Sequence, residues 1–521
     1  ARPLFTPSPV SHVLEHHNPL SQTGHGCYHG RDAGCVERRR SVKIPQRGLS
    51  KEEIYRRLEE YRAHDMPWRD GRTWAYVYDP GREAEEVTKH AYTSYLTENA
   101  LDPTVFPSAL RFENELVAMA AAHLGGDDQV VGNFTSGGTE SIMLAVKTAR
   151  DYARAKRPQV REPEIVLPIT AHAAFHKAAH YLCLKPVIVP VDPETFRADP
   201  DAIRRAITGN TVLLVGSAVS YAHGVVDPIP EIGRIALEYD LLLHVDACMG
   251  GFLLPYFRRL GAPVPEFDFT VPGVTSMSMD FHKYAFAAKG ASVVLYRNKE
   301  LRKYQIYSCA QWTGYTVINP TIQSTKSVGP LAAAWAVLNF IGDEGYLEIA
   351  RQVLDATRRI ADAIERMPDL RLLGRPDMNL VAFTSDTVNV FHLIDEMKQR
   401  QWYIQPQLAY RGSKENVHLS INPASVRWVD EFIADLGQCV EKVKEMPPAV
   451  PDSLKQALAG IDPATFTTET FSQMLGMAGV QATRLPDRMA AINEVLNSLP
   501  PLLKEKLLTE FMNELMAYRG A

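Results

Sequence analysis

The 521-residue sequence has few cysteines, no long apolar run and no excess of charge of one sign. Its six cysteines are scattered without paired spacing, which is typical of reduced thiols rather than of a disulfide-stapled fold. The most apolar stretches, such as residues 211–218, are far shorter than the roughly 20 residues of a membrane-spanning helix. The start of the sequence lacks the apolar core of a secretion signal. We therefore expect a cytoplasmic protein with no membrane span.

Charge excludes a further class of partner. Lys and Arg number 56 against 61 Asp and Glu, and the basic residues are spread along the chain, so the net charge is -5. Neither nucleic acid nor an anionic membrane surface is an expected partner, because both need a concentrated basic patch. A composition of 45% hydrophobic and 22% charged residues is that of a folded globular chain. We expect a small-molecule substrate instead.

Alternating helical and strand-like segments predict an α/β fold. Helical periods near 112–123 and 140–156 are followed by short apolar runs bounded by turn residues, at 165–169, 186–191, 212–215 and 241–245. Two more strands are expected at 276–279 and 291–296. This alternation is typical of a large, mostly parallel sheet with helices on both faces.

The chain is too long for one hydrophobic core. Proline- and glycine-rich stretches and changes in periodicity indicate where it divides into domains. We predict an N-terminal arm and helix over 1–95, a large domain over 96–340, a smaller α+β domain over 341–447 and a helical tail over 448–521. Prolines at 447, 448 and 451 mark the linker before the tail.

Four short features in the sheet-forming region carry the chemistry. The first is Thr135-Ser136-Gly137-Gly138-Thr139-Glu140, which precedes a helical run. Two glycines let the backbone approach an anion, and a helix N-terminus offers it unpaired N–H groups and a positive dipole end. A phosphate group is the expected guest, although a Gly-Gly turn before a helix is by itself also an ordinary connection.

The second and third features follow strand-like runs, where a doubly wound sheet binds its ligands. His172 comes just after the run at 165–169, so its imidazole can lie flat on a heteroaromatic ring, or alternatively cap a helix or fill the core. Asp246 ends the apolar run at 241–245. A carboxylate at the end of a buried strand needs a cation, which is either a protonated pyridine nitrogen or a nearby Arg or Lys.

The fourth feature is Lys283, which follows His282 after another apolar strand. A lysine in a buried setting becomes a nucleophile and forms Schiff bases with carbonyls, whereas most lysines are simply exposed. A phosphate cradle, a ring-stacking group, an acid for a pyridine nitrogen and an imine-forming lysine together describe a site for pyridoxal 5'-phosphate.

Four runs resemble sphingosine-1-phosphate lyases, within the group II amino-acid decarboxylase clan of fold type I pyridoxal phosphate enzymes. They are residues 133–141, 223–228, 244–252 and 280–284, the last followed by Lys289-Gly290. The similarity covers about residues 50 to 440. It implies a fold type I, transferase-like architecture with a large sheet domain, a smaller C-terminal domain and a homodimer with shared active sites.

The resemblance assigns roles position by position. Lys283 would form the Schiff base with the cofactor, Asp246 would face the pyridine nitrogen and His172 would stack on the ring. The phosphate would be held by Ser136, Gly137, Gly138 and Thr139 with His282. Tyr78 matches a tyrosine that reaches into the neighbouring subunit's site, although its flanking residues differ. Asn99 and Lys289 match further active-site positions.

Two departures from the lyase pattern concern the substrate. The lyases have Asn-Pro-Leu-His-Pro where this chain has Asn99-Ala100-Leu101-Asp102-Pro103, and Ser-Arg-Pro-Gly where it has Lys326 within Thr-Lys-Ser-Val-Gly. We place Asn99, Asp102 and Lys326 among the substrate-binding residues. Because lysine only partly replaces a bidentate arginine, a phosphorylated long-chain base is a doubtful substrate.

The expected activity is that of a carbon–carbon lyase acting on an amine or amino acid. Retro-aldol cleavage to an aldehyde is favoured, amino-acid decarboxylation is the alternative, and a catalytically weak cofactor-binding scaffold is a third hypothesis. A metal site is not expected, because the cluster His16, His17, His25, Cys27, His29 and Cys35 lacks the ligand spacing of structural zinc.

Overall fold

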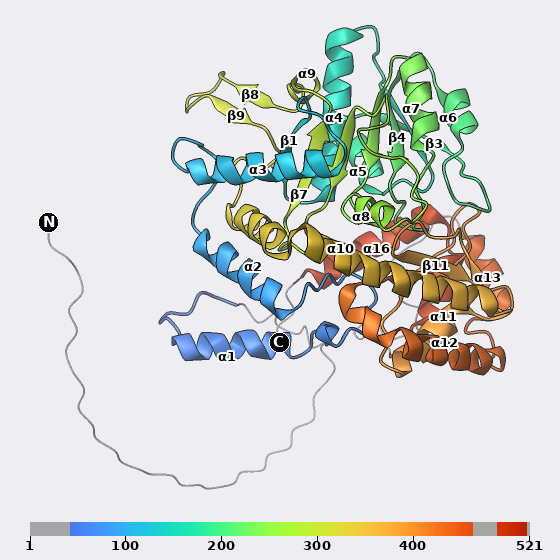
Figure 1. Ribbon diagram of the computed structural model, residues 1–521. Helices are drawn as coiled ribbons and strands as arrows, with labels where there is room; N and C mark the ends of the chain where they lie inside the picture. The colour runs from blue at the N-terminus through green and yellow to red at the C-terminus, as the bar shows by residue number, and fades with distance from the viewer. Residues whose placement is uncertain (1–41, 462–486, 518–521) are drawn as a thin grey trace, which may run out of the picture.

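The computed structural model describes residues 42–461 and 487–517 (Figure 1). The predicted His- and Cys-rich cluster in the arm therefore lies outside the described residues. Within the described ranges no group of three or more His, Cys, Asp or Glu side chains is arranged to hold a metal ion. In the same ranges no helix has the length and apolarity needed to cross a bilayer.

A seven-stranded sheet forms the centre of the larger part of the molecule, in the order β1-β7-β6-β5-β4-β2-β3. Only β7 runs against its neighbours; the remaining strands all point the same way. The strands are β1 (Val131–Thr135), β2 (Glu164–Pro168), β3 (Lys185–Val189), β4 (Thr211–Ser217), β5 (Leu242–Asp246), β6 (Ser276–Met279) and β7 (Ser292–Tyr296). The carboxyl ends of six strands thus meet at one edge.

Sequence reasoning located β2 to β7 but missed β1. Strands β2, β4, β6 and β7 are buried along their whole length. In β2, β4 and β7 this burial on both faces accounts for the continuous apolar run in the sequence, whereas β6 alternates Ser and Met. The sequence of β1, Val-Gly-Asn-Phe-Thr, has no such run because β1 is an edge strand paired only with β7. Its place matters, since it delivers the Gly-Gly turn to the common edge.

Helices cover both faces of this sheet, and strand alternation divides the core between them. On β2, Ile165 and Leu167 pack with α4 (Gly138–Lys156) and α5 (Ala174–Leu182), whereas Val166 belongs to the core that includes α7 (Ile229–Glu238). The other helices of this part are α3 (Pro107–His123), α6 (Pro200–Ala206), α8 (Leu254–Arg259) and α9 (Lys299–Arg302). A small hairpin of β8 (Tyr307–Cys309) and β9 (Val317–Asn319) projects from it.

A second, antiparallel sheet follows, in the order β10-β11-β13-β12. The long helix α10 (Gly329–Arg366), which is kinked at Gly342 (φ 65°), runs between the two parts in Figure 1. The strands are β10 (Arg371–Leu372), β11 (Leu380–Thr384), β12 (Gln405–Gln407) and β13 (Asn416–Ser420), and they are covered by α11 (Val390–Gln399), η2 (Pro423–Trp428) and α12 (Val429–Lys444). The exact domain boundaries remain a prediction.

The segment before α2 crosses this second sheet. The elements here are α1 (Lys51–Arg62), η1 (Trp68–Asp70) and α2 (Arg82–Ser94). The Trp74 ring is fully buried and stacks on Phe432 at 4.1 Å between centroids. The backbone N–H of Trp74 donates to the backbone carbonyl of Tyr403 at 2.9 Å, and the backbone carbonyl of Trp74 accepts from Ser420 N at 2.7 Å. These contacts fix the segment around Trp74, which leads to the edge of the seven-stranded sheet where the parallel strands end.

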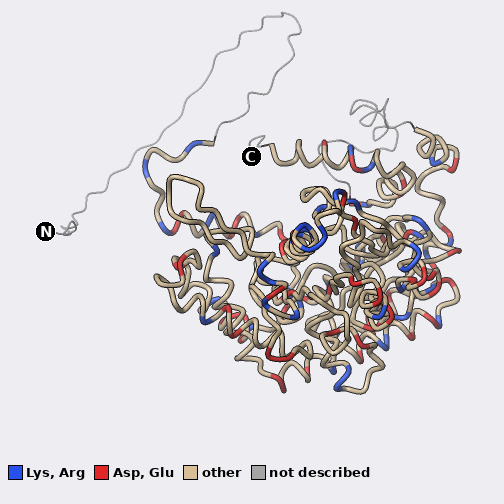
Figure 2. Tube along the Cα trace, turned by 90° about the horizontal axis from the view of Figure 1, so that it is seen from above, with Lys and Arg blue, Asp and Glu red and all other residues tan. Residues whose placement is uncertain are grey.

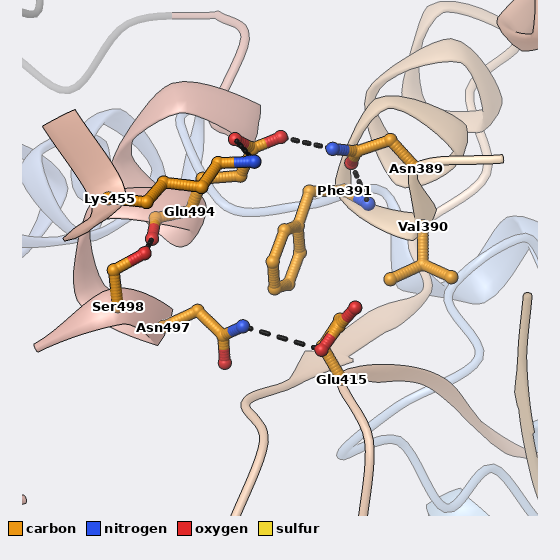
Figure 3. Close-up of a pocket in the computed structure, with 8 residues that line it drawn as sticks. All are labelled: Asn389, Val390, Phe391, Glu415, Lys455, Glu494, Asn497 and Ser498. Atoms are coloured by element: carbon orange, nitrogen blue, oxygen red, sulfur yellow. Dashed lines mark hydrogen bonds and ion pairs between the residues drawn. The ribbon is translucent and has the colours of Figure 1, made fainter. Parts of the chain in front are cut away.

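The C-terminal tail docks on α11 through buried polar contacts. It comprises α13 (Asp452–Ala459), α15 (Ala490–Ser498) and α16 (Pro501–Leu515). The carboxylate of Glu494, which is 4% exposed, accepts from the side-chain amide of Asn389, from Val450 N at 3.1 Å and from Lys455 Nζ at 3.0 Å (Figure 3). Asp395 accepts from Met489 N and Ala490 N. Charges of both signs are interspersed over the tube in Figure 2.

Candidate active site

Lys283 forms a buried ion pair just beyond the carboxyl end of β6. Its Nζ lies 3.0 Å from Oδ2 of Asp280, whose side chain is 2% exposed. Burial by itself works against the charged form of each partner, but the charge of the other outweighs it. The pKa of Lys283 is therefore raised and that of Asp280 is lowered. Lys283, whose side chain is 20% exposed, thus lies against a buried carboxylate, and its amine is protonated in the free chain.

His282 joins this pair to the Gly-Gly turn. Its Nδ1 accepts from Ala291 N at 3.1 Å, so the proton of a neutral ring sits on Nε2, which lies 3.5 Å from Asp280 Oδ2. Burial lowers the pKa of His282 in spite of the Asp280 charge. A Cβ added to Gly137 would lie 3.5 Å from its Cε1. The imidazole therefore stands between the turn and the Lys283 pair.

The Gly-Gly turn forms a cradle at the start of α4. No side chain caps this helix, so the N–H groups of its first turn have no side-chain acceptor. A Cβ on Gly138 would come within 2.7 Å of Cys248 Sγ and 3.0 Å of both Asp280 carboxylate oxygens. Only glycine fits here, and the cradle therefore lies directly against the Asp280–Lys283 pair.

Ser136, which the sequence places among the phosphate-binding residues, hydrogen-bonds to a carboxylate of its own chain. Its N–H and its hydroxyl both donate to Oε2 of Glu140 at 2.7 Å, and Oε1 of the same carboxylate accepts from Ile322 N at 2.9 Å. Ser136 is therefore held by Glu140 in this structure, and its contact with a phosphate stays a prediction. Sequence reasoning missed this role of Glu140, although the Ser-x-x-x-Glu spacing places the two side chains one helical turn apart.

Asp246 ends β5 as an unpaired carboxylate. It is 7% exposed and its Oδ1 accepts from Cys248 N at 3.0 Å and from Ser278 Oγ at 3.3 Å. No Lys, Arg or His of the described ranges forms an ion pair with it, which disfavours the structural alternative of a nearby cation. A buried carboxylate without a cation is costly, so Asp246 fits a protonated pyridine nitrogen.

His172 follows the carboxyl end of β2 and is exposed. Its Nδ1 accepts from Ala174 N at 3.2 Å, which fixes the ring at the start of α5. This is the helix-capping contact that the sequence left open, but it leaves the faces of the ring free. Stacking on a cofactor ring stays a prediction, and the capping bond would hold the imidazole in place for it.

Tyr78 lies in the site of its own chain. Its ring packs edge-on against Tyr284 at 5.1 Å, and Lys289 Nζ lies 4.3 Å from the ring centroid. Burial raises the pKa of Tyr78 to about 12, and the charges of Lys283 and Asp280 also act on it. The anchored segment around Trp74 brings Tyr78 close to Lys289 of its own chain, and its expected role in a neighbouring subunit's site stays a prediction.

Lys289 is a second amine in this group. Its Nζ donates to His282 O at 3.0 Å, at the open side of the site. Burial, together with the charge of Lys283, lowers the pKa of Lys289 to about 8. A lysine with a pKa this close to neutrality exchanges protons readily, so it is suited to acid–base chemistry.

Two residues of this group were not singled out from the sequence. Asp280 lies within a run quoted for the resemblance, and its spacing of three from Lys283 was a usable signal. Tyr221 follows the carboxyl end of β4, which points to the same edge. Its hydroxyl donates to Gln405 Oε1 at 2.7 Å, and burial raises its pKa to about 12, with Tyr78 and Lys283 also acting on it.

The three predicted substrate-binding residues are not gathered at Lys283. Asn99 Oδ1 accepts from Leu101 N at 3.2 Å, within its own turn. Asp102 is exposed and accepts from Thr104 N and Oγ1, at 2.8 and 2.6 Å, which lowers its pKa. Its carboxylate is engaged in an exposed turn, and no contact with the Lys283 group brings it into that pocket.

Lys326 is held in a buried ion pair. Its Nζ is buried and donates to Glu113 Oε2 at 2.7 Å and to Phe134 O at 3.1 Å. Oε1 of Glu113 accepts from Asn133 Nδ2 and Phe134 N, both at 3.0 Å. The ammonium thus ties α3 and β1 to the loop before α10, behind the cradle. The ammonium is engaged by groups of the protein itself, and the substrate contact expected for Lys326 stays a prediction.

Replacing Lys326 by Met tests that assignment. The change leaves Glu113 as an unpaired buried carboxylate, so we expect a loss of about 3–5 kcal/mol in the free energy of unfolding. Thermal unfolding followed by circular dichroism measures it. The control is Lys303→Met, which breaks the exposed pair with Glu300 and should cost about 1 kcal/mol or less. Unchanged stability with a raised KM would instead assign Lys326 to the substrate.

Comparison with known proteins identifies the family. A family model described as the pyridoxal-dependent decarboxylase conserved domain matches residues 91–386, and one described as the putative HTH domain at the C-terminus of pyridoxal-dependent enzymes matches 452–514. The sphingosine-1-phosphate lyase of Arabidopsis thaliana is 39% identical over 463 residues, which cover 87% of this chain and 80% of the relative.

Solved structures agree with this placement. A sphingosine-1-phosphate lyase of Burkholderia pseudomallei superimposes with a TM-score of 0.75 at 33% identity, covering 86% of this chain and 98% of that one. A glutamate decarboxylase of Lactobacillus brevis, at 20% identity, shares the fold with a TM-score of 0.68 over 78% of this chain and 96% of its own. The expected fold type I architecture and the pyridoxal phosphate cofactor are both confirmed. The chain belongs to the sphingosine-1-phosphate lyases of the pyridoxal-dependent decarboxylase family, and it is a pyridoxal phosphate-dependent lyase.

Proposed function

We propose that the protein cleaves the Cα–Cβ bond of a β-hydroxy amine by a retro-aldol reaction and releases an aldehyde. The observation that carries the proposal is the placement of Lys289 and Tyr78 against the Lys283 pocket. Retro-aldol cleavage requires a base for the β-hydroxyl proton, which decarboxylation does not. Lys289, with its pKa lowered to about 8, is suited to take that proton.

The residues proposed to hold the cofactor follow four strands, β1, β2, β5 and β6, that end at one edge. Lys283 supplies the amine, and the first-turn N–H groups of Gly138 and Thr139 bind the phosphate together with His282. Asp246 meets the pyridine nitrogen, and His172 covers the ring. Pyridoxal phosphate, when bound, supplies an electron sink for the bond that breaks. The unpaired state of Asp246 and the missing Cβ of Gly138 support this arrangement.

The substrate class follows from the groups around Lys289. The relatives are named for sphingosine 1-phosphate, so a phosphorylated β-hydroxy amine is the first candidate. Lys326 does not supply a phosphate contact in our proposal, because its ammonium is held by Glu113. A phosphate would have to be met by Lys289 or by other groups at the open side of the pocket. Decarboxylation is the second candidate, favoured by the match to the decarboxylase domain.

We infer a cytoplasmic homodimer for the assembled enzyme. The four cysteines of the described ranges, at 183, 248, 309 and 439, are all unpaired, which suits a reducing compartment. A closed two-fold dimer is the commonest assembly of soluble oligomers. Each subunit would use its own Tyr78, as the contact of that ring with Lys289 of the same chain supports.

Product analysis tests the reaction. The purified holoenzyme is incubated with sphingosine 1-phosphate, with shorter phosphorylated and unphosphorylated β-hydroxy amines, and with aspartate and glutamate. We expect an aldehyde from a β-hydroxy amine and no carbon dioxide from the amino acids. Lys283→Ala is the control and should abolish turnover. Carbon dioxide release without aldehyde would establish the decarboxylase, and no turnover of any compound would contradict both.

The pH profile tests the role of Lys289. Because only the neutral amine accepts a proton, kcat/KM should rise with pH through a midpoint near or above 8. Burial, the main cause of the lowered pKa, persists when the cofactor removes the charge of Lys283. Lys289→Met should cost about 100-fold or more in kcat and remove this rise. An activity that falls as pH rises through 8 would make Lys289 a cation for the substrate instead.

Mixed subunits test whether Tyr78 acts in its own chain. Tyr78→Phe and Lys283→Ala proteins are co-expressed with different tags, and the mixed species is purified. No site in such a dimer holds both wild-type side chains if Tyr78 acts within its chain, so activity should equal the average of the two parent variants. A gain to roughly half of wild-type activity would show that Tyr78 crosses the interface.

A further inference from the structure

A groove of about 430 Å³ lies between the 409–413 hairpin and the start of α16. Its walls come from two parts of the chain that the catalytic site does not use. One is the tip that joins β12 to β13, and the other is the junction of α15 with α16. The residues relevant here are Tyr410, Arg411, Ser413, Asn497, Pro501 and Lys504. We call it the tail groove.

The tail groove carries two cations and no acid. Arg411 and Lys504 are the charged residues among those that line it. Within the described ranges neither forms an ion pair, and Lys504 Nζ has only a long contact of 3.4 Å with Asn497 O. Burial lowers the pKa of Lys504, with no carboxylate to offset it. The N-terminal end of α16, at Pro501, adds the positive end of a helix dipole.

A smaller cavity next to the tail groove contains a lysine that is paired with a carboxylate. It measures about 80 Å³ and shares Asn497 with the tail groove (Figure 3). Lys455 there is paired with Glu494 at 3.0 Å, and Glu415 accepts from Asn497 Nδ2 at 3.4 Å. The lysine of this cavity thus has a carboxylate partner. The two cations of the tail groove have no such partner in the described ranges, so an anion bound there would supply one.

The backbone of the hairpin tip is strained at Arg411. Arg411 and Gly412 have φ of 40° and 96°, and Tyr410 and Ser413 exchange hydrogen bonds of 2.9 and 3.0 Å between their backbones. A two-residue hairpin turn with positive φ at both central positions favours Asn-Gly. An arginine in the left-handed region is strained relative to Asn or Gly. This strained turn places a guanidinium at the groove.

We propose that the tail groove binds a small oxyanion, a phosphate group free or carried by a small metabolite, between Arg411 and Lys504. The guanidinium offers paired N–H donors to such a group and the ammonium a point charge. Ser413 and Asn497 add a hydroxyl and an amide. Nucleic acid is disfavoured although the tail matches a putative HTH domain, because residues 452–514 hold five Lys and Arg against eight Asp and Glu. The site is separate from the cofactor cradle on α4.

Calorimetric titration of the holoenzyme with inorganic phosphate tests the proposal, since the cofactor then fills the cradle. Ionic strength is held constant with chloride. We expect saturable binding that weakens at least tenfold in Arg411→Asn and in Lys504→Met. Lys299→Gln, an exposed lysine on α9, is the control and should bind as wild type. Arg411→Asn creates the favoured Asn-Gly turn, so its loss of binding cannot be a loss of folding.

Parallel titrations identify the source of the anion. Phosphoethanolamine and a short DNA duplex are compared with inorganic phosphate at the same ionic strength. Tighter binding of phosphoethanolamine that also depends on Arg411 supports a phosphorylated metabolite, and equal binding supports free phosphate. Absence of saturable binding, or equal binding by wild type, Arg411→Asn and Lys504→Met, would overturn the proposal. Binding of the duplex alone, lost in Arg411→Asn, would overturn it in favour of nucleic acid.

Discussion

The buried ion pair between Lys283 and Asp280 is the interaction on which the site depends. It holds the reactive amine against a buried carboxylate at the end of β6, and the mutual charge keeps both groups ionised. Only a neutral amine attacks an aldehyde, so the proton of Lys283 has to leave before the covalent bond forms. The Asp280 carboxylate then retains His282 at 3.5 Å as its neighbour. Cofactor loading and the ionisation of this pair are therefore linked.

The direction of the strands explains why so few residues suffice for the site. Strands β1, β2, β4, β5 and β6 all point the same way, and the antiparallel β7 restores this direction for β1. Their carboxyl ends deliver the cradle, His172, Tyr221, Asp246 and Lys283 to one edge, which is where open α/β sheets bind ligands. The second sheet closes this edge through the anchored segment that carries Tyr78.

Much of this arrangement was readable from the sequence, because it rests on local patterns. Continuous apolar runs located the buried strands, and a carboxylate or a lysine at the end of such a run predicted a partner at the sheet edge. Long-range pairing was not readable. Nothing near Lys326 in the sequence indicates that Glu113 will neutralise it, so the buried ion pair between them could not be predicted. The edge strand β1 and the position of Tyr78 in its own site likewise depend on contacts between distant segments.

The most direct measurement is the location of the covalent bond to the cofactor. Borohydride reduction of the purified holoenzyme, followed by proteolysis and mass spectrometry, marks the lysine that carries the pyridoxyl group. Our account predicts a single labelled peptide with the modification on Lys283 and none on Lys289. Label on Lys289 or on another lysine, or no label at all, would contradict it.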